Sequence, residues 1–160
     1  MDIEDNPFDD ILLALEGICV WVDNALASSP NVLVHCVQGI SRSGAVIVAY
    51  LMRQQAIDYE SALELARESR AMIMPNSGFV DQLRLWHAMG YSIYDNDEKM
   101  VEASPTIKLK YLEWKDNRGI LLSKAEQAKQ EALMKSMSDL VARFGERRMK
   151  LGDGNLEESV

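Results

Sequence analysis

Residues 35–43 read His35-Cys36-Val37-Gln38-Gly39-Ile40-Ser41-Arg42-Ser43, and the segments on either side of this stretch decide the expected fold. Before it, the apolar, β-branched run Val32-Leu33-Val34 predicts a buried strand. After it, the apolar run from Gly44 to Met52 predicts a buried helix. A turn between a strand and a helix N-terminus directs backbone N–H groups and the partial positive charge of the helix dipole toward one point. The stretch therefore predicts an anion-binding cradle.

Two side chains give this cradle its expected chemistry. Cys36 stands at the end of the strand, where backbone N–H groups and a nearby cation stabilise a thiolate. Arg42 stands at the start of the helix, and its planar guanidinium can hold two oxygens at once, which lysine cannot do. The alternatives are a buried apolar cysteine and a surface arginine, and the position of both residues at one strand-to-helix turn disfavours them.

The pattern His-Cys-x-x-Gly-x-x-Arg-Ser resembles the signature of the protein tyrosine phosphatase superfamily, and its Ser41-Arg42-Ser43 ending resembles the dual-specificity branch. The resemblance extends over about Asp2 to Asp95, and Trp86 to Tyr91 is similar to the YVH-type subgroup. It implies an α/β fold. In this chain we expect the C-terminal part of a parallel or mixed phosphatase sheet flanked by helices, dominated by helix and followed by a C-terminal helical extension.

The resemblance also implies a reaction. The Cys36 thiolate would attack phosphotyrosine and phosphoserine or phosphothreonine in proteins, and water would hydrolyse the resulting phosphocysteine. Ser43 would help the thiolate to leave in the second step, and His35 would support the loop and tune the thiol. The phosphate oxygens would be held by the guanidinium of Arg42 and by the backbone N–H groups of Val37, Gln38, Gly39, Ile40, Ser41 and Arg42.

The leaving oxygen needs a proton, so the mechanism needs a general acid. In the family this is an aspartate on a loop before a helix, roughly thirty residues ahead of the cysteine. Asp5 stands 36 − 5 = 31 residues ahead, on the loop before the first predicted helix. Asp9 and Asp10 are expected in the first turn of that helix, where carboxylates favour the helix dipole, and Asp2 in an acidic terminus. Asp5 is therefore the predicted acid.

Helical spacing predicts further elements around the cradle. We expect helices from Pro7 to about Ala27, over 59–70 with Asp58 as the N-cap, and over 79–89 after a turn at 75–78. The predicted domains are a partial catalytic domain over 1–95, a linker with a short helix over 96–122, a charged amphipathic helix over 123–150 and a disordered tail over 151–160. Residues 107–114 favour a helix with a strand as the alternative, and Ser123 to Glu126 predicts the start of the long helix.

Composition limits the partners. The 160-residue chain has a net charge of −8, which argues against nucleic acid or an anionic membrane. Its two cysteines, Cys19 and Cys36, form no disulfide framework or zinc site, so we expect no metal or cofactor and a cytoplasmic or nuclear location. Cys19 is expected to pack in the core, with a resolving thiol as the alternative. The C-terminal helix is a candidate for self-association or for binding a partner helix.

The early position of Cys36 departs from the family pattern, in which strands and a helix precede the cysteine. A strand that is apolar on both faces needs neighbours for its backbone groups, so we expect the N-terminal part of the domain to be absent from this chain. A second hypothesis follows: a catalytically incompetent fragment that binds phosphate or a protein. A third is a rhodanese-like or arsenate-reducing enzyme, which Ser43 and the upstream aspartate disfavour.

Overall fold

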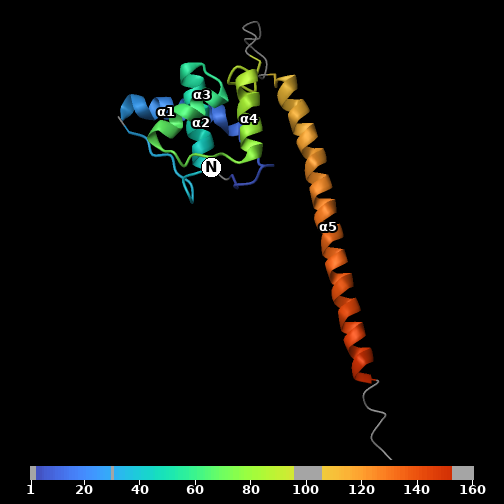
Figure 1. The fold of residues 1–160 in the computed structure, drawn as a ribbon. Helices are drawn as coiled ribbons and strands as arrows, with labels where there is room; N and C mark the ends of the chain where they lie inside the picture. The colour runs from blue at the N-terminus through green and yellow to red at the C-terminus, as the bar shows by residue number, and fades with distance from the viewer. Residues whose placement is uncertain (1–2, 30, 96–105, 153–160) are drawn as a thin grey trace, which may run out of the picture. The chain divides into compact units, whose positions relative to one another are not determined.

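The computed structural model describes residues 3–29, 31–95 and 106–152, with side chains described as far as residue 139. The elements in chain order are the helices α1 (Leu12–Ser28), α2 (Arg42–Gln55), α3 (Tyr59–Ser69), α4 (Ser77–Ala88) and α5 (Leu109–Gly152) (Figure 1). The chain divides into two compact units, Met1–Asp116 and Asn117–Val160. The predicted dominance of helix is confirmed.

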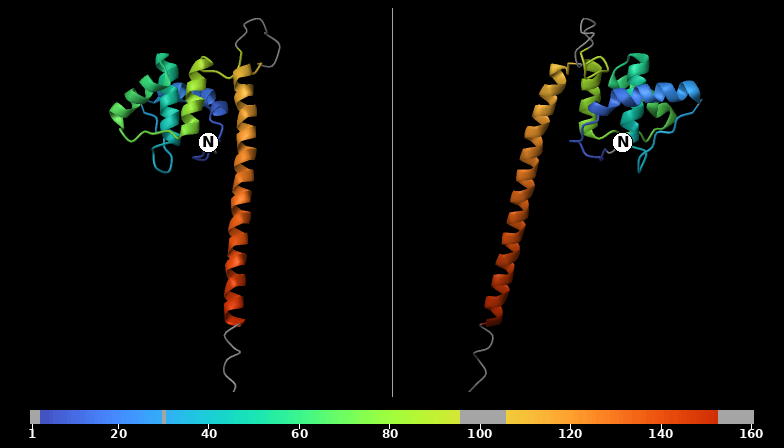
Figure 2. Two further views of the ribbon diagram at one scale, coloured as in Figure 1. Left: turned by 45° about the vertical axis from the view of Figure 1, so that its right-hand side comes forward. Right: turned by 180° about the vertical axis from the view of Figure 1, so that it is seen from behind.

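The first unit is built around α2, which contacts α1, α3 and α4 (Figures 1 and 2). Seven residues of α2 are buried, as its apolar sequence predicts. The core joins Leu12 and Leu15 of α1 to Val48 and Met52 of α2, and Trp86 of α4 is fully buried beside them. Tyr111, in the first turn of α5, belongs to the same core. Burial of apolar surface from five helices therefore stabilises this unit.

Two helices begin directly after a residue whose side chain caps them. Asp58 accepts a hydrogen bond from the backbone N–H of Ser61 and starts α3, as the sequence predicts. Asn76, in the predicted turn at 75–78, accepts one from the N–H of Phe79 and starts α4. Cys19 is buried in α1, which confirms the prediction of core packing.

The predicted strand is not confirmed. Residues 31–36 have no regular secondary structure and pair with no other segment within the described ranges, and Leu33 is 83% exposed. A strand requires a neighbour that satisfies its N–H and C=O groups, and the described residues supply none at this position. The β-pairing that is present is a single antiparallel bridge between Tyr94 and Ile107.

The first helix begins later than its apolar spacing predicts. α1 starts at Leu12, because the side chain of Asn6 accepts a hydrogen bond from Phe8 N–H and its carbonyl accepts one from Asp9 N–H. These bonds form a turn around Pro7 that competes with helix. Asp9 and Asp10 therefore precede the helix, and the prediction that they lie in its first turn is wrong.

The predicted helix start at Ser123 is also wrong. α5 already begins at Leu109 and runs through this position, where the Ser123 hydroxyl donates to the carbonyl of Ile120 instead of capping a new helix. Of the two alternatives for 107–114, each holds in part, since Ile107 is in the bridge and the helix follows from Leu109. Ser104 and Pro105, which the sequence predicts as the N-cap and first position of the helix that follows, lie outside the described residues.

The loop before α1 rests on the start of α4. A Cβ added to Gly78 would lie 1.8 Å from the carbonyl oxygen of Pro7, so no other residue fits at this contact. Inside the first unit, the buried Gln82 extends the contact: its Oε1 accepts from Ile11 N–H at 2.8 Å and its Nε2 donates to the Asp9 carbonyl at 2.7 Å. α4 therefore fixes the loop that carries Asp5.

We predict that Gly78→Ala destabilises the first unit. Relieving the clash with Pro7 requires a backbone shift, which costs about 1–3 kcal/mol in well-packed sites. A thermal melt followed by circular dichroism should show a midpoint several degrees below that of the unmodified chain. Gly17→Ala is the matched control, because a Cβ at Gly17 in α1 meets nothing within 4 Å and alanine favours helix. Equal melting temperatures for the two variants would contradict the contact.

Candidate active site

The residues predicted to form the cradle, 37–42, form a turn that leads from residues 31–36 into α2. Gly39 has φ +67, a conformation that glycine adopts without strain. From outside the turn, Arg70 Nε donates to the Gly39 carbonyl at 3.1 Å and Met74 N–H donates to the Ile40 carbonyl at 3.1 Å. The segment after α3 thus holds these carbonyls outward.

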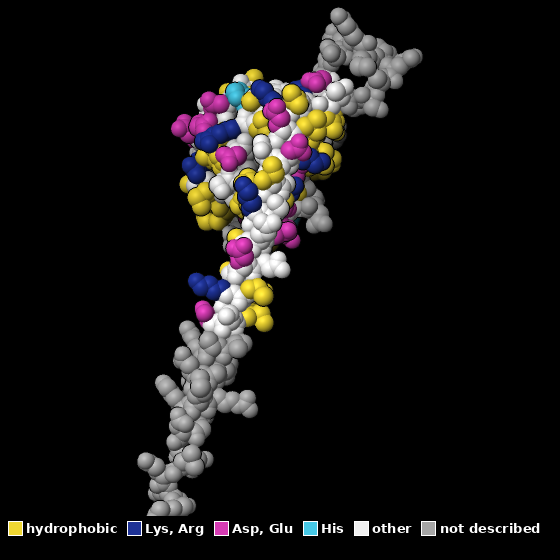
Figure 3. All heavy atoms as spheres, turned by 90° about the vertical axis from the view of Figure 1, so that its right-hand side faces the viewer, with side chains coloured by type: hydrophobic (Ala, Val, Ile, Leu, Met, Phe, Trp, Pro, Cys, Tyr) yellow, Lys and Arg dark blue, Asp and Glu magenta, His cyan; other side chains and the backbone are white. Residues whose placement is uncertain are grey.

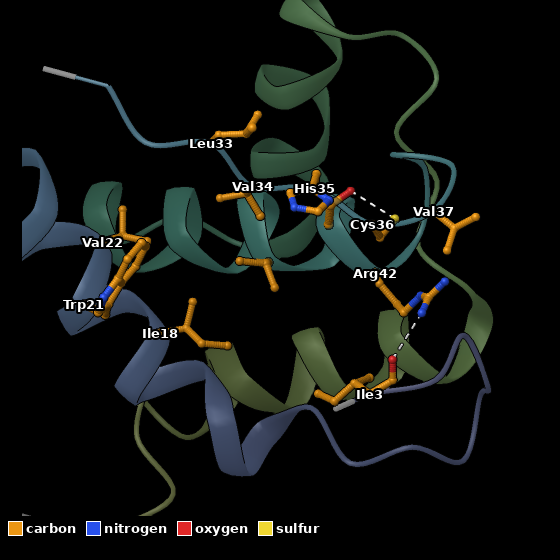
Figure 4. A pocket seen from close by; sticks show the side chains of 12 residues that line it. Ile3, Ile18, Trp21, Val22, Leu33, Val34, His35, Cys36, Val37 and Arg42 are labelled. Atoms are coloured by element: carbon orange, nitrogen blue, oxygen red, sulfur yellow. Dashed lines mark hydrogen bonds between the residues drawn. The ribbon is translucent and has the colours of Figure 1, made fainter. Parts of the chain in front are cut away.

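The Cys36 thiol lies inside this turn. Its Sγ accepts from the backbone N–H of Gly39 at 3.2 Å and lies 3.3 Å from the hydroxyl of Ser43, a contact drawn in Figure 4. Burial raises the pKa of Cys36, but the hydrogen bonds from Ser43, Gly39 and Ile40 outweigh it and lower this pKa from 9.0 to about 6. At neutral pH the sulfur is therefore mostly thiolate, the form that attacks electrophiles.

We predict that alkylation of Cys36 rises with pH through a midpoint near 6. The thiol form dominates below this pH and the thiolate above it, so iodoacetamide should react with Cys36 readily at neutral pH. Ser43→Ala removes one stabilising bond and should move the midpoint upward. Peptide mass spectrometry separates this reaction from that of Cys19, whose pKa is raised by burial and which should stay unmodified in the folded chain. A Cys36 midpoint near 9 would contradict the geometry.

Arg42 is the first residue of α2, and it lines the same pocket as Cys36 and Val37. Nη1 donates to the carbonyl of Ile3 at 3.3 Å, while Nε is buried without a hydrogen-bond partner among the described residues. Buried guanidinium donors normally have an acceptor. Arg42 lines the same pocket as Cys36, so the thiol and the guanidinium belong to one cavity.

Asp5 is joined to the turn directly. Its Oδ1 accepts from the Ser41 hydroxyl at 2.6 Å and from Asn76 Nδ2 at 2.9 Å. Burial raises the pKa of Asp5, but these two hydrogen bonds and the positive charge of Arg42 lower it below its usual value. The structure thus places Asp5 one hydrogen bond from the cradle.

The other candidate acids have structural partners. Asp9 accepts from the N–H of Glu4 at 2.7 Å. Asp10 accepts from the N–H of Leu13 at 3.3 Å and from the hydroxyl of Tyr111 at 2.8 Å. Neither bonds to the cradle among the described residues, and Asp2 lies outside them.

Of the remaining predicted residues, His35 and Val37 line a pocket together with Cys36 and Arg42. His35 lies beside Cys36 on the pocket wall, and no hydrogen bond joins it to the turn in the described part of the chain (Figure 4). Val37 is 86% exposed at the rim, and Gln38 is exposed beside it. The pocket has a volume of about 690 Å³ and a largely apolar wall that includes Trp21 of α1 and Leu33 of the segment before the turn.

Three residues of the site are not evident from the signature. Arg70, Asn76 and Gln82 lie beyond it in sequence and support it from outside. The turn chemistry at 75–78 indicates that Asn76 caps a helix, but its bond to Asp5 spans 71 residues and has no local signal in the sequence.

A comparison with family models shows the family to which this chain belongs. The model described as "Dual specificity phosphatase, catalytic domain" matches residues 1–89, more than half of the chain. The chain belongs to this family. The resemblance inferred from the Cys36–Ser43 stretch is thereby confirmed.

Individual relatives agree with this assignment. The dual specificity protein phosphatase MPK-4 of Drosophila melanogaster is 42% identical over 99 residues, which cover 62% of this chain and 26% of the relative. Among solved structures, the human tyrosine phosphatase-like serine/threonine/tyrosine-interacting protein is 38% identical, with a TM-score of 0.54 over 56% of this chain and 59% of its own. The Yvh1 phosphatase domain of Chaetomium thermophilum is also 38% identical, with a TM-score of 0.53 over 56% of this chain and 64% of its own.

These matches cover only part of the length of each relative. The chain spans about a quarter of the MPK-4 relative and about six-tenths of these two solved structures.

No helix among the described residues is long and apolar enough to cross a membrane. On the face of the molecule shown in Figure 3, acidic, basic and hydrophobic side chains are interspersed.

Proposed function

We propose that this chain acts as a cysteine-dependent protein phosphatase on phosphotyrosine and on phosphoserine or phosphothreonine. The observation that carries the proposal is the environment of the Cys36 sulfur, which accepts from Gly39 N–H at 3.2 Å and lies 3.3 Å from the Ser43 hydroxyl, contacts that lower the pKa of the thiol. The partners are phosphorylated proteins. Both described cysteines are free, which fits a reducing compartment such as the cytoplasm or nucleus.

In the first step the Cys36 thiolate attacks phosphorus in line with the leaving oxygen. The S–P bond forms and the P–O bond to the substrate breaks, and the leaving oxygen takes a proton from Asp5. The guanidinium of Arg42, which lines the same pocket as Cys36, and the backbone N–H groups of the turn hold the non-bridging oxygens while charge moves onto them. The product alcohol or phenol leaves, and the phosphoryl group remains on sulfur.

In the second step water attacks the phosphocysteine. Asp5, now a carboxylate, accepts a proton from this water, the S–P bond breaks, and inorganic phosphate is released. The sulfur leaves as a thiolate. Ser43, whose hydroxyl lies 3.3 Å from the sulfur, donates a hydrogen bond that stabilises this leaving group.

The two protonation states must coexist in the substrate complex. In the free protein Asp5 has a lowered pKa, so its carboxyl group is ionised when Cys36 is a thiolate. A bound phosphate dianion engages Arg42 and adds negative charge beside Asp5, and both effects raise the pKa of Asp5. Substrate binding therefore favours the protonated acid that the first step requires.

The test of the proposed function is hydrolysis of an aryl phosphate and of phosphotyrosine and phosphothreonine peptides by the full 160-residue chain. We expect saturable release of inorganic phosphate that vanadate inhibits. The alternative, a fragment that only binds phosphate, is less well supported, because binding alone does not require a lowered pKa at Cys36. Thermal stabilisation by phosphate together with no turnover would overturn the proposal in favour of that alternative.

A further inference from the structure

Asn76 occupies a junction between the acid, the cradle and a helix. Its backbone N–H donates to the Ser41 hydroxyl oxygen at 3.0 Å, and its side-chain Nδ2 donates to Asp5 Oδ1 at 2.9 Å. Its side-chain Oδ1 accepts from the N–H of Phe79 at 3.0 Å, which caps α4. One residue thus connects three groups that lie far apart in sequence.

The cap fixes the orientation of the Asn76 side chain. A backbone N–H can only donate, so the amide oxygen must face Phe79 and the amide nitrogen must face Asp5. A flipped amide would lose both bonds. The direction of the bond to Asp5 is therefore set by the start of α4.

The same residue directs the hydroxyl proton of Ser41. Because the Ser41 oxygen accepts from Asn76 N–H, its own proton is available for Asp5, to which it donates at 2.6 Å. Both donors reach the same oxygen, Oδ1 of Asp5. When Asp5 is protonated, Oδ1 remains the acceptor and the proton resides on Oδ2.

We propose that Asn76 is a positioning residue that selects Oδ2 of Asp5 as the proton-donating atom and tunes the acidity of Asp5 through the Ser41 hydroxyl and its own amide. The catalytic consequence rests on the proposed function, in which Asp5 is the general acid. Arg42 of α2 is the charged group that acts on Asp5 in the free protein, and its attraction adds to that of the two donors. Asn76 itself touches no substrate in this account.

The test is a carboxyl-carbon NMR titration of Asp5 in the full chain and in variants that keep a helix cap. Asn76→Ser retains a capping oxygen, but its side chain is too short to reach Asp5. Asp58→Ser is the matched control, because it makes the same kind of exchange at the cap of α3, away from Asp5. We expect the pKa of Asp5 to rise in Asn76→Ser and to stay unchanged in Asp58→Ser.

A second variant separates the lost donor from any loss of folding. Asn76→Asp keeps a strong cap and places a carboxylate where the amide donor was, so the pKa of Asp5 should rise further than in Asn76→Ser. For a substrate with a poor leaving group, kcat should fall roughly tenfold in either variant, because Asp5 loses the bond that positions it, although its higher pKa favours the protonated form. An Asp5 titration that is unchanged in both variants would overturn the inference.

The titration of Asp5 can be measured whether or not the chain has phosphatase activity. If the chain lacks phosphatase activity, the proposed function fails, yet the titration of Asp5 still reports whether Asn76 tunes it. If the chain is active and Asp5 titrates identically in all variants, the inference about Asn76 fails alone.

Discussion

Replacing Cys36 with serine should lower kcat for an aryl phosphate by roughly 10⁴-fold or more, because the new hydroxyl is not ionised at neutral pH and cannot replace a thiolate nucleophile. The turn should remain folded, since serine is close in size to cysteine and Arg42 is unchanged. Binding of vanadate or phosphate, measured by thermal stabilisation, should therefore persist. Steady-state kinetics on the purified full chain gives the measurement.

Cys19→Ala is the matched control for this variant. Cys19 is the second free cysteine and is buried in α1, so its loss should leave kcat unchanged even if it lowers the melting temperature. Phosphatase activity that survives Cys36→Ser, or that is lost in Cys19→Ala while the chain stays folded, would refute the assignment of the nucleophile.

Asp5→Asn should have the second largest effect, and its size should depend on the substrate. Asparagine keeps the shape of the side chain but cannot donate an acid proton, so kcat should fall roughly 10²-fold for phenyl phosphate. A substrate with an acidic leaving group, such as a dinitrophenyl phosphate, needs little protonation and should lose much less. The ratio of the two rates, measured in both proteins, isolates proton donation from folding.

Asp9→Asn provides the comparison at a neighbouring carboxylate. Asp9 bonds to Glu4 N–H and lies outside the cradle network, so its substitution should leave the ratio of rates unchanged. An unaltered ratio in Asp5→Asn, or a larger change in Asp9→Asn, would assign proton donation to a different carboxylate.

Local signals were sufficient for much of this fold. The turn at 35–43, the buried helix after it and the cap at Asp58 are all visible in short stretches, because each depends on spacing or on a side chain three residues away. Apolar periodicity was less reliable at element ends. The Asn6 side chain moves the start of α1 past Pro7, and the hydroxyl of Ser123 bonds backward inside α5.

The site contacts that the sequence does not predict are hydrogen bonds between residues far apart in the chain. The network that joins Asp5 to Ser41 and Asn76 spans 36 and 71 residues, and the contact of Gln82 with the loop before α1 spans 71 to 73. Such partners are set by how α4 packs beside the cradle, not by spacing along the chain. The predicted sheet depended on strand neighbours, which the segment at 31–36 lacks among the described residues.

The proposed mechanism requires a phosphoryl group on the sulfur of Cys36. A rapid denaturing quench during turnover of an aryl phosphate, followed by peptide mass spectrometry, measures this directly. We expect the peptide that contains Cys36 to carry one phosphoryl group, and expect none on the same peptide from Cys36→Ser. Turnover with no phosphoryl group on Cys36, or with the group on another residue, would contradict the mechanism.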